Sequence, residues 1–132
     1  GIASQNKGGD GMQRIVIDFP WPSSALSPNA RGHWSKKAKA AKAYRANCFW
    51  LTKAAGIQID WEGEAHLWMT FFPPDRRARD DDNLIASFKS GRDGMATALG
   101  IDDKRFRIHP WVSDQVIKGG CVRISISKGP EQ

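Results

Sequence analysis

Four segments of the chain have the apolar alternation or the continuous apolar character of β-strands. Proline pairs end the first two, at Pro20–Pro22 and at Pro73–Pro74, because proline fixes φ and removes a backbone donor. The sequence therefore predicts strands over Arg14–Phe19, Glu64–Phe72, Ile108–Val116 and Cys121–Ser127.

Two longer segments have helical periodicity. The first predicted helix spans Lys36–Ala55, with Ser35 as its N-cap and Gly56 just beyond its end. The second begins at Asp82 or Asn83, ends at Leu99 and is followed by Gly100. Its interior holds Gly91 and Gly94, and each lowers helix stability by about 1 kcal/mol. We therefore expect a neighbouring backbone to approach closely at these glycines.

The predicted order β-α-β-α-β-β indicates an α+β fold with a single mixed sheet and helices packed on it. The sequence Lys118-Gly119-Gly120 predicts a hairpin turn, so the last two strands are expected to form an antiparallel pair. We expect residues 14–128 to form one domain and residues 1–13 to be a flexible tail.

The 132 residues suffice for one domain, and the net charge of +6 favours polyanionic partners, nucleic acid above all. No apolar run approaches the roughly 20 residues of a membrane span, and residues 1–11 have no hydrophobic centre. Cys48 and Cys121 lie too far apart to suggest a zinc site and are interpreted as free thiols. Together these features predict a cytoplasmic protein with no membrane partner.

Candidate chemistry is concentrated where three arginines run into three carboxylates. Arg76, Arg77 and Arg79 precede Asp80-Asp81-Asp82-Asn83, and Asp102-Asp103 follows the second helix. Clustered carboxylates repel one another and favour a cation such as Mg²⁺, while guanidinium groups suit phosphate. Two other roles for these aspartates remain open. The first motif can cap a helix while the second forms an ordinary turn, or the aspartates can bind calcium or another structural ion.

The second helix separates the two acidic motifs. If residues 80–82 are extended, Asp80 and Asp82 point to the same side. A straight helix of about 25 Å would leave Asp103 at the opposite end. Asp103 can join the pair only if the helix bends, if the chain turns back after Gly100, or if Asp103 comes from a second subunit.

Basic and aromatic residues also surround the start of the first helix. Lys36 and Lys37, with Arg31 in the preceding loop, form either a solvated face or a surface that neutralises DNA phosphates. Trp21 and Trp34 are candidates for stacking on an exposed base or for lining a dimer interface.

These motifs resemble the RusA family of Holliday-junction resolvases. The segment Pro74–Leu84 is similar to the central motif of the family, and Asp102-Asp103 to its second acidic motif. Phe19–Ser23 and the Lys118–Gly120 segment also match, so the resemblance is colinear from about Ile15 to Ser127.

The resemblance implies a crossover-junction endodeoxyribonuclease that acts in DNA recombination and repair. Such an enzyme is a homodimer that depends on Mg²⁺ and cuts four-way junctions symmetrically. Members of this type are often encoded by phages or prophages.

The resemblance also implies roles for individual residues. Asp80, Asp82 and Asp103 correspond to the metal-binding aspartates, whereas Asp102 receives no firm role. The family's catalytic lysine corresponds to Ala86, and Lys89, three residues later, is the expected substitute. This departure leaves two alternatives, a junction-binding protein with impaired catalysis and a general Mg²⁺ nuclease for other branched DNA. The expected DNA-binding residues are Arg76, Arg77, Arg79, Asn83, Lys36, Lys37 and Arg31.

Overall fold

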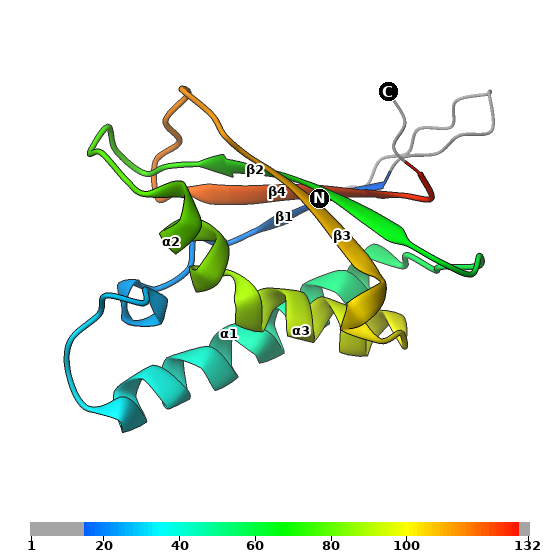
Figure 1. Cartoon of the computed structure of the whole chain (residues 1–132), viewed down its shortest axis with the longest axis horizontal. Helices are drawn as coiled ribbons and strands as arrows, with labels where there is room; N and C mark the ends of the chain where they lie inside the picture. Colours follow the sequence, from blue (N-terminus) through cyan, green and yellow to red (C-terminus); the bar gives the residue numbers. More distant parts are fainter. Residues whose placement is uncertain (1–14, 130–132) are drawn as a thin grey trace.

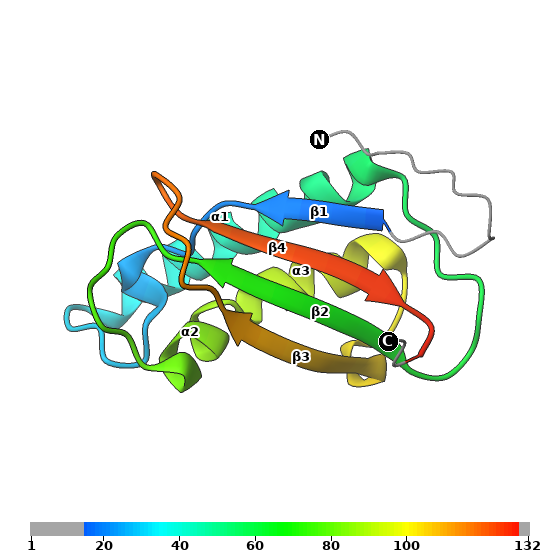
Figure 2. The same ribbon diagram turned by 90° about the horizontal axis from the view of Figure 1, so that it is seen from above.

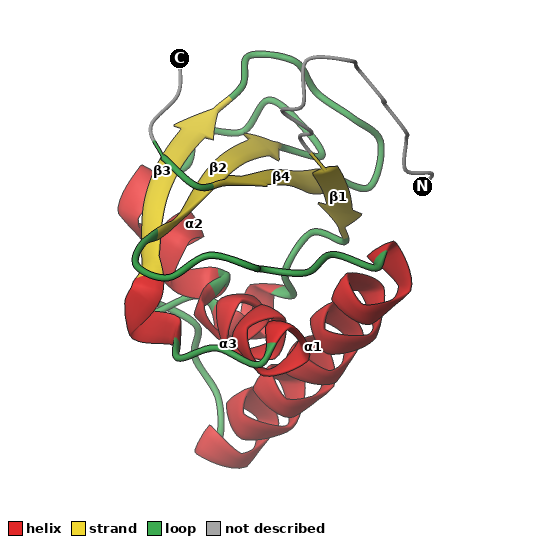
Figure 3. Ribbon diagram, turned by 90° about the vertical axis from the view of Figure 1, so that its right-hand side faces the viewer, coloured by secondary structure: helices red, strands yellow, loops and turns green. Residues whose placement is uncertain are grey.

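The computed structural model describes residues 15–129 and has two layers, a mixed β-sheet and helices packed on one of its faces (Figures 1 and 3). The predicted tail over residues 1–13 lies outside the described residues, as does Arg14. The predicted α+β class and single mixed sheet are confirmed. Within residues 15–129, every helix is too short or too polar to span a bilayer.

The sheet has four strands in the order β1-β4-β2-β3 (Figure 2). β2 is parallel to β3, and β4 is antiparallel to both β1 and β2. β1, β2 and β3 therefore run in the same direction, and their carboxyl ends lie along one edge of the sheet, its carboxyl-terminal edge. The strands are β1 (Ile15–Phe19), β2 (Ala65–Phe72), β3 (Phe106–Val112) and β4 (Cys121–Ser127).

The prediction that the last two strands pair with each other is wrong. β4 lies between β1 and β2, while β3 occupies the edge beside β2 and ends at Val112 rather than Val116. Pro110 explains the edge position of β3, because proline has no N–H for a second neighbouring strand. Gly119 and Gly120 do form a turn with positive φ, but that turn belongs to the loop that crosses over β2.

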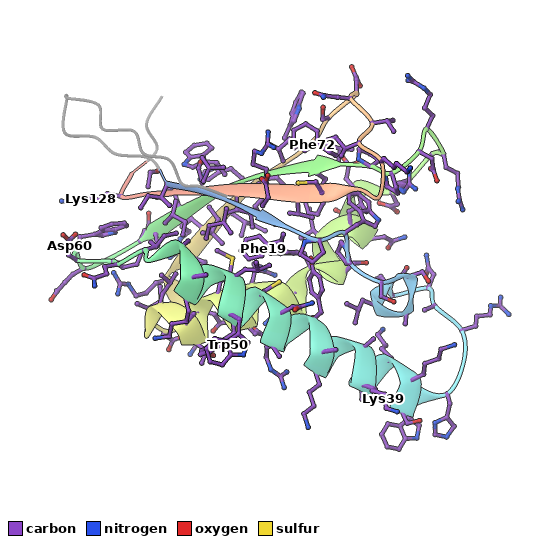
Figure 4. All side chains as sticks on the ribbon, turned by 180° about the vertical axis from the view of Figure 1, so that it is seen from behind. Phe19, Lys39, Trp50, Asp60, Phe72 and Lys128 are labelled. Carbon is purple, nitrogen blue, oxygen red and sulfur yellow. The ribbon has the colours of Figure 1, made fainter. Side chains whose placement is uncertain are left out.

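α1 (Trp34–Ala55) begins two residues earlier than predicted. Its N-cap is His33, whose Nδ1 accepts the backbone N–H of Ser35 at 3.1 Å, so Ser35 lies in the first turn instead of capping the helix. The predicted end at Gly56 is confirmed, because Gly56 adopts the left-handed conformation with φ of 70°. In Figure 4, Phe19 lies between the sheet and α1, whereas Trp50 lies on the outer side of the helix.

The second predicted helix is divided at Phe88 into α2 (Asp81–Ser87) and α3 (Lys89–Leu99). The Phe88 side chain is fully buried and packs edge-on against the rings of Phe19, Tyr44 and Phe71. This aromatic cluster fixes the junction of the two helices to the sheet, which the 3.6-residue periodicity could not reveal.

The close approach expected at the helix glycines is present. A Cβ at Gly94 would lie 2.3 Å from the carbonyl oxygen of Arg45 on α1, and one at Gly91 would lie 2.9 Å from the Tyr44 ring. At Gly94 the neighbour is a backbone, as predicted, and at Gly91 it is aromatic side chains. These contacts allow α3 to pack directly on α1.

Candidate functional site

The arginine-rich segment forms the loop from β2 to α2, at the edge where the parallel strands end. Arg79 holds this loop together: its guanidinium donates to the carbonyl oxygens of Asp75 and Arg77 at 3.1 and 3.0 Å, and to Asp75 Oδ1 at 2.7 Å. Its side chain is only 18% exposed and lies over the Trp21 ring. Arg79 therefore shapes the loop.

Arg77 and Arg76 differ from Arg79 in their exposure. The Arg77 side chain is 77% exposed and has one contact of 3.3 Å to Asp75, and Arg76 is also exposed. The backbone N–H of Arg77 and the guanidinium of Arg79 lower the pKa of Asp75, so that carboxylate stays charged within the loop. Of the three arginines, Arg76 and Arg77 have guanidinium groups accessible to a phosphate.

Asp80 is the N-cap of α2, and its Oδ1 accepts the backbone N–H of Asp82 at 2.9 Å. Extended backbone stops at Asp80, because Asp81 and Asp82 already lie in the first helical turn. The cap, rather than strand alternation, therefore places the Asp80 carboxylate against the backbone N–H of Asp82. All three aspartates are exposed. Capping, one of the two alternatives from the sequence, is thus part of the role of Asp80.

Asp103 lies beside Lys89 rather than beside this pair. The Nζ of Lys89 donates to Asp93 Oδ1 at 2.7 Å and to Asp103 Oδ2 at 3.5 Å. The chain turns back after Gly100, where the N–H of Ile101 bonds the carbonyl of Ala96 at 3.1 Å. The bend and the reversal that the sequence left open both exist, and they bring Asp103 to α3.

Asp102 caps the short 3-10 helix Asp103–Arg105 by accepting the N–H of Lys104 at 2.8 Å. This hydrogen bond is also the main cause of its lowered pKa. Asp102 is therefore engaged in the local turn, as the ordinary-turn alternative predicted for this pair.

The three predicted metal-binding aspartates are not assembled within one chain. Lys89, which holds Asp103, follows Asp82 by seven positions, or about 10 Å along a helix axis. In the part of the chain that the structure covers, no three His, Cys, Asp or Glu side chains are grouped so that they could hold a metal ion. Asp80 and Asp82 are exposed at the start of α2, where the backbone N–H of Asp82 donates to Asp80 Oδ1.

The remaining predicted DNA-binding residues come from α2 and from the start of α1. Asn83 follows the acidic triplet on α2 and is half-buried. Arg31, Lys36 and Lys37 are exposed at the start of α1, which the chain reaches after leaving β1 (Figure 1).

A cavity that the sequence did not predict opens beside Asp80. Its volume is about 430 Å³, and it lies between the loop after β1 and the loop after β2. The Ser-rich composition of residues 23–27 was its only visible sign in the sequence. Its lining includes Trp21, Ser23, Ser24, Ser27, Arg77, Arg79, Asp80, Asn83 and Ser87.

No family model matches the chain. A protein of Xylella fastidiosa (strain Temecula1 / ATCC 700964), named "Uncharacterized protein", is 46% identical to it over 119 residues. This match covers 88% of the present chain and 76% of the relative, whose name assigns no activity. The chain therefore belongs to the same family as this uncharacterized protein of Xylella fastidiosa.

Proposed function

We propose that the protein is a Mg²⁺-dependent, structure-selective endodeoxyribonuclease that resolves four-way DNA junctions. The observation that carries the proposal is the exposed Asp80–Asp82 pair, which directly follows a loop with two accessible arginines. A basic protein with a local carboxylate pair and flanking guanidinium groups has the chemistry that a metal nuclease requires. The colinear resemblance to the RusA family supports the choice of a branched DNA substrate.

The donor set fits Mg²⁺. This ion is usually bound by one or two carboxylates, with water and substrate phosphate completing its shell. The capping bond uses Oδ1 of Asp80, so Oδ2 and the carboxylate of Asp82 remain for an ion. When bound, Mg²⁺ would activate a water and stabilise the charge that develops on the phosphodiester.

The arginines and the loop have separate tasks in this proposal. Arg76 and Arg77 neutralise the phosphates next to the scissile one, because a guanidinium forks onto phosphate oxygens. Arg79 fixes the loop that carries them, through its three hydrogen bonds to Asp75 and Arg77. Arg31, Lys36 and Lys37 extend the basic surface toward the DNA arms.

We further propose that the protein acts as a homodimer and that Asp103 completes the site across the dimer. A four-way junction has two-fold symmetry, and two strands must be cut. Within one chain Asp103 is held at Lys89, away from Asp80 and Asp82. In this proposal a second copy of the chain supplies that carboxylate.

A second candidate function is a junction-binding protein with impaired catalysis. The position that corresponds to the family lysine is Ala86, and Lys89 already binds Asp93 and Asp103. An ammonium group held between two carboxylates is less available to a phosphate. This arrangement favours binding without efficient cutting.

One experiment separates the candidates. The protein is incubated with a mobile four-way junction, with linear duplex and with single-stranded DNA, each in Mg²⁺ and in EDTA. Paired, symmetric nicks in the junction alone, only in Mg²⁺, are the expected result. Tight junction binding without nicks would favour the second candidate, and equal cutting of all three substrates would indicate a general nuclease.

A further inference from the structure

The cavity of about 430 Å³ beside Asp80 lies within the size range of small-molecule sites, roughly 300–1,000 Å³. Its walls come from residues 21–27 after β1, from residues 74–80 after β2 and from one side of α2. The hydroxyl of Tyr44 on α1 donates to the carbonyl of Pro20 and so anchors the first loop to the helix layer. The cavity is thus built between segments that the fold holds in place.

Trp21 gives the cavity a fixed aromatic wall. Its ring packs edge-on against Phe71, and Gly120 approaches so closely that a Cβ there would lie 2.8 Å from Trp21 atoms. The guanidinium of Arg79 lies over the indole ring, 5.7 Å from its centroid. Aromatic rings, indole among them, and guanidinium planes are surfaces on which proteins stack unpaired bases.

Hydroxyl and amide groups line the rest of the cavity. The Ser23 and Ser27 oxygens accept backbone N–H groups from within their own loop, so each hydroxyl keeps its proton for donation. Ser24 and Asn83 add further donors and acceptors. Such groups can pair with the polar edge of a planar base without adding charge.

The charges around the cavity favour a phosphate at one end. Arg77 lines it and is 77% exposed, while the carboxylate of Asp75 is occupied by Arg77 and Arg79. Asp80 also lines the cavity. A ligand with a planar base and a phosphate would therefore place that phosphate at Arg77, in the cavity that Asp80 also lines.

We propose that this cavity binds one unstacked deoxynucleotide, with its base against Trp21 and Arg79 and its phosphate at Arg77. The assignment rests on the proposed function, because a branch point supplies nucleotides that cost little to unstack. A nucleotide bound in this cavity would fix the scissile phosphate relative to Asp80, and the cavity would read the identity of one base.

The test uses the four deoxynucleoside 5′-monophosphates as probes in EDTA, so that neither a metal nor DNA cleavage is involved. Saturable binding is followed by NMR shifts of indole N–H signals. Each monophosphate is compared with its nucleoside and with inorganic phosphate. We expect at least one monophosphate to bind about fivefold or more tightly than inorganic phosphate, because stacking of one base adds about 1–3 kcal/mol.

Two variants locate the site. Ser24→Trp fills the cavity, and Asn29→Trp places the same side chain on an exposed residue of the same loop outside it. Ser24→Trp should abolish monophosphate binding, and Asn29→Trp should leave it unchanged. Arg77→Gln should weaken binding of the monophosphate but not of the nucleoside, and it remains informative if Ser24→Trp fails to fold.

The proposal would be overturned if no monophosphate binds, or if inorganic phosphate binds as tightly as the monophosphates. It would also be overturned if Ser24→Trp binds a monophosphate as the wild type does. Because the readout needs neither Mg²⁺ nor a junction, its failure is distinct from failure of the proposed nuclease activity. Nucleotide binding without junction cleavage would contradict the proposed function alone.

Discussion

Asp80 has one observed role, the capping of α2, and one proposed role, metal binding, which the sequence presented as alternatives. One of its oxygens caps α2 by accepting the N–H of Asp82, and its other oxygen is available to a cation. A cap needs only a hydrogen-bond acceptor, and Asn is as good an N-cap as Asp. A hard divalent ion, in contrast, favours the charged carboxylate. The two roles can therefore be separated at this one residue.

Asp80→Asn should keep the stability of the wild type and lose Mg²⁺-dependent nicking of a four-way junction. Asp80→Ala should lose both, with the free energy of unfolding lower by about 1 kcal/mol because the cap is removed. Urea unfolding and junction nicking measure the two effects on the same samples. Full nicking by Asp80→Asn would mean that Asp80 acts as a cap alone.

At the scale of elements, local signals located the strands, the glycine-terminated helix ends and the close contact at Gly94. They failed where tertiary packing decides. Phe88 divides a periodic helix because three aromatic rings surround it. The start of α1 was misplaced for a local reason, because the His33 ring accepts the N–H of Ser35 and caps the helix in its stead. Strand pairing was also mispredicted, although Pro110 carried a local signal that its strand lies at an edge.

Gly94→Ala should destabilise the protein through the α1–α3 contact. The added Cβ would lie 2.3 Å from the Arg45 carbonyl oxygen, and overpacking of this kind costs about 1–3 kcal/mol or more. In an open helix the same change would stabilise by about 1 kcal/mol. Gly129→Ala, where no atom lies within 4 Å, is the control and should change stability by less than about 0.5 kcal/mol. The free energy of unfolding is measured in urea. A value for Gly94→Ala that equals or exceeds that of the wild type would refute the close packing.

At the scale of the whole molecule, the sheet topology sets what lies near the candidate site. β1, β2 and β3 end at one edge, so the loops that bear Trp21 and Asp80 meet there and enclose the cavity. The sequence identified the acidic and basic residues, because their chemistry is local. It could not reveal the cavity or the pairing of Asp103 with Lys89, since both depend on which distant segments the fold brings together.

A mixed-subunit experiment tests the proposed composition of the site. Asp82→Asn and Asp103→Asn chains carrying different tags are co-expressed, and the heterodimer is isolated through both tags. If Asp103 acts across the dimer, the intact Asp82 of one chain meets the intact Asp103 of the other. One complete site then forms, and nicking of one strand returns. Each variant alone should be inactive. A heterodimer as inactive as either homodimer would place Asp103 in the site of its own chain.

Whether Asp82 binds the catalytic metal is tested by comparing Asp82→Asn with Asp81→Asn on a four-way junction. Both variants remove one negative charge from the first turn of α2, but only Asp82 belongs to the proposed metal pair. We predict that Asp82→Asn binds the junction normally in EDTA and cuts it on the order of 100-fold more slowly in Mg²⁺. Asp81→Asn should bind and cut like the wild type. Cleavage by Asp82→Asn at the wild-type rate would contradict the proposed metal site.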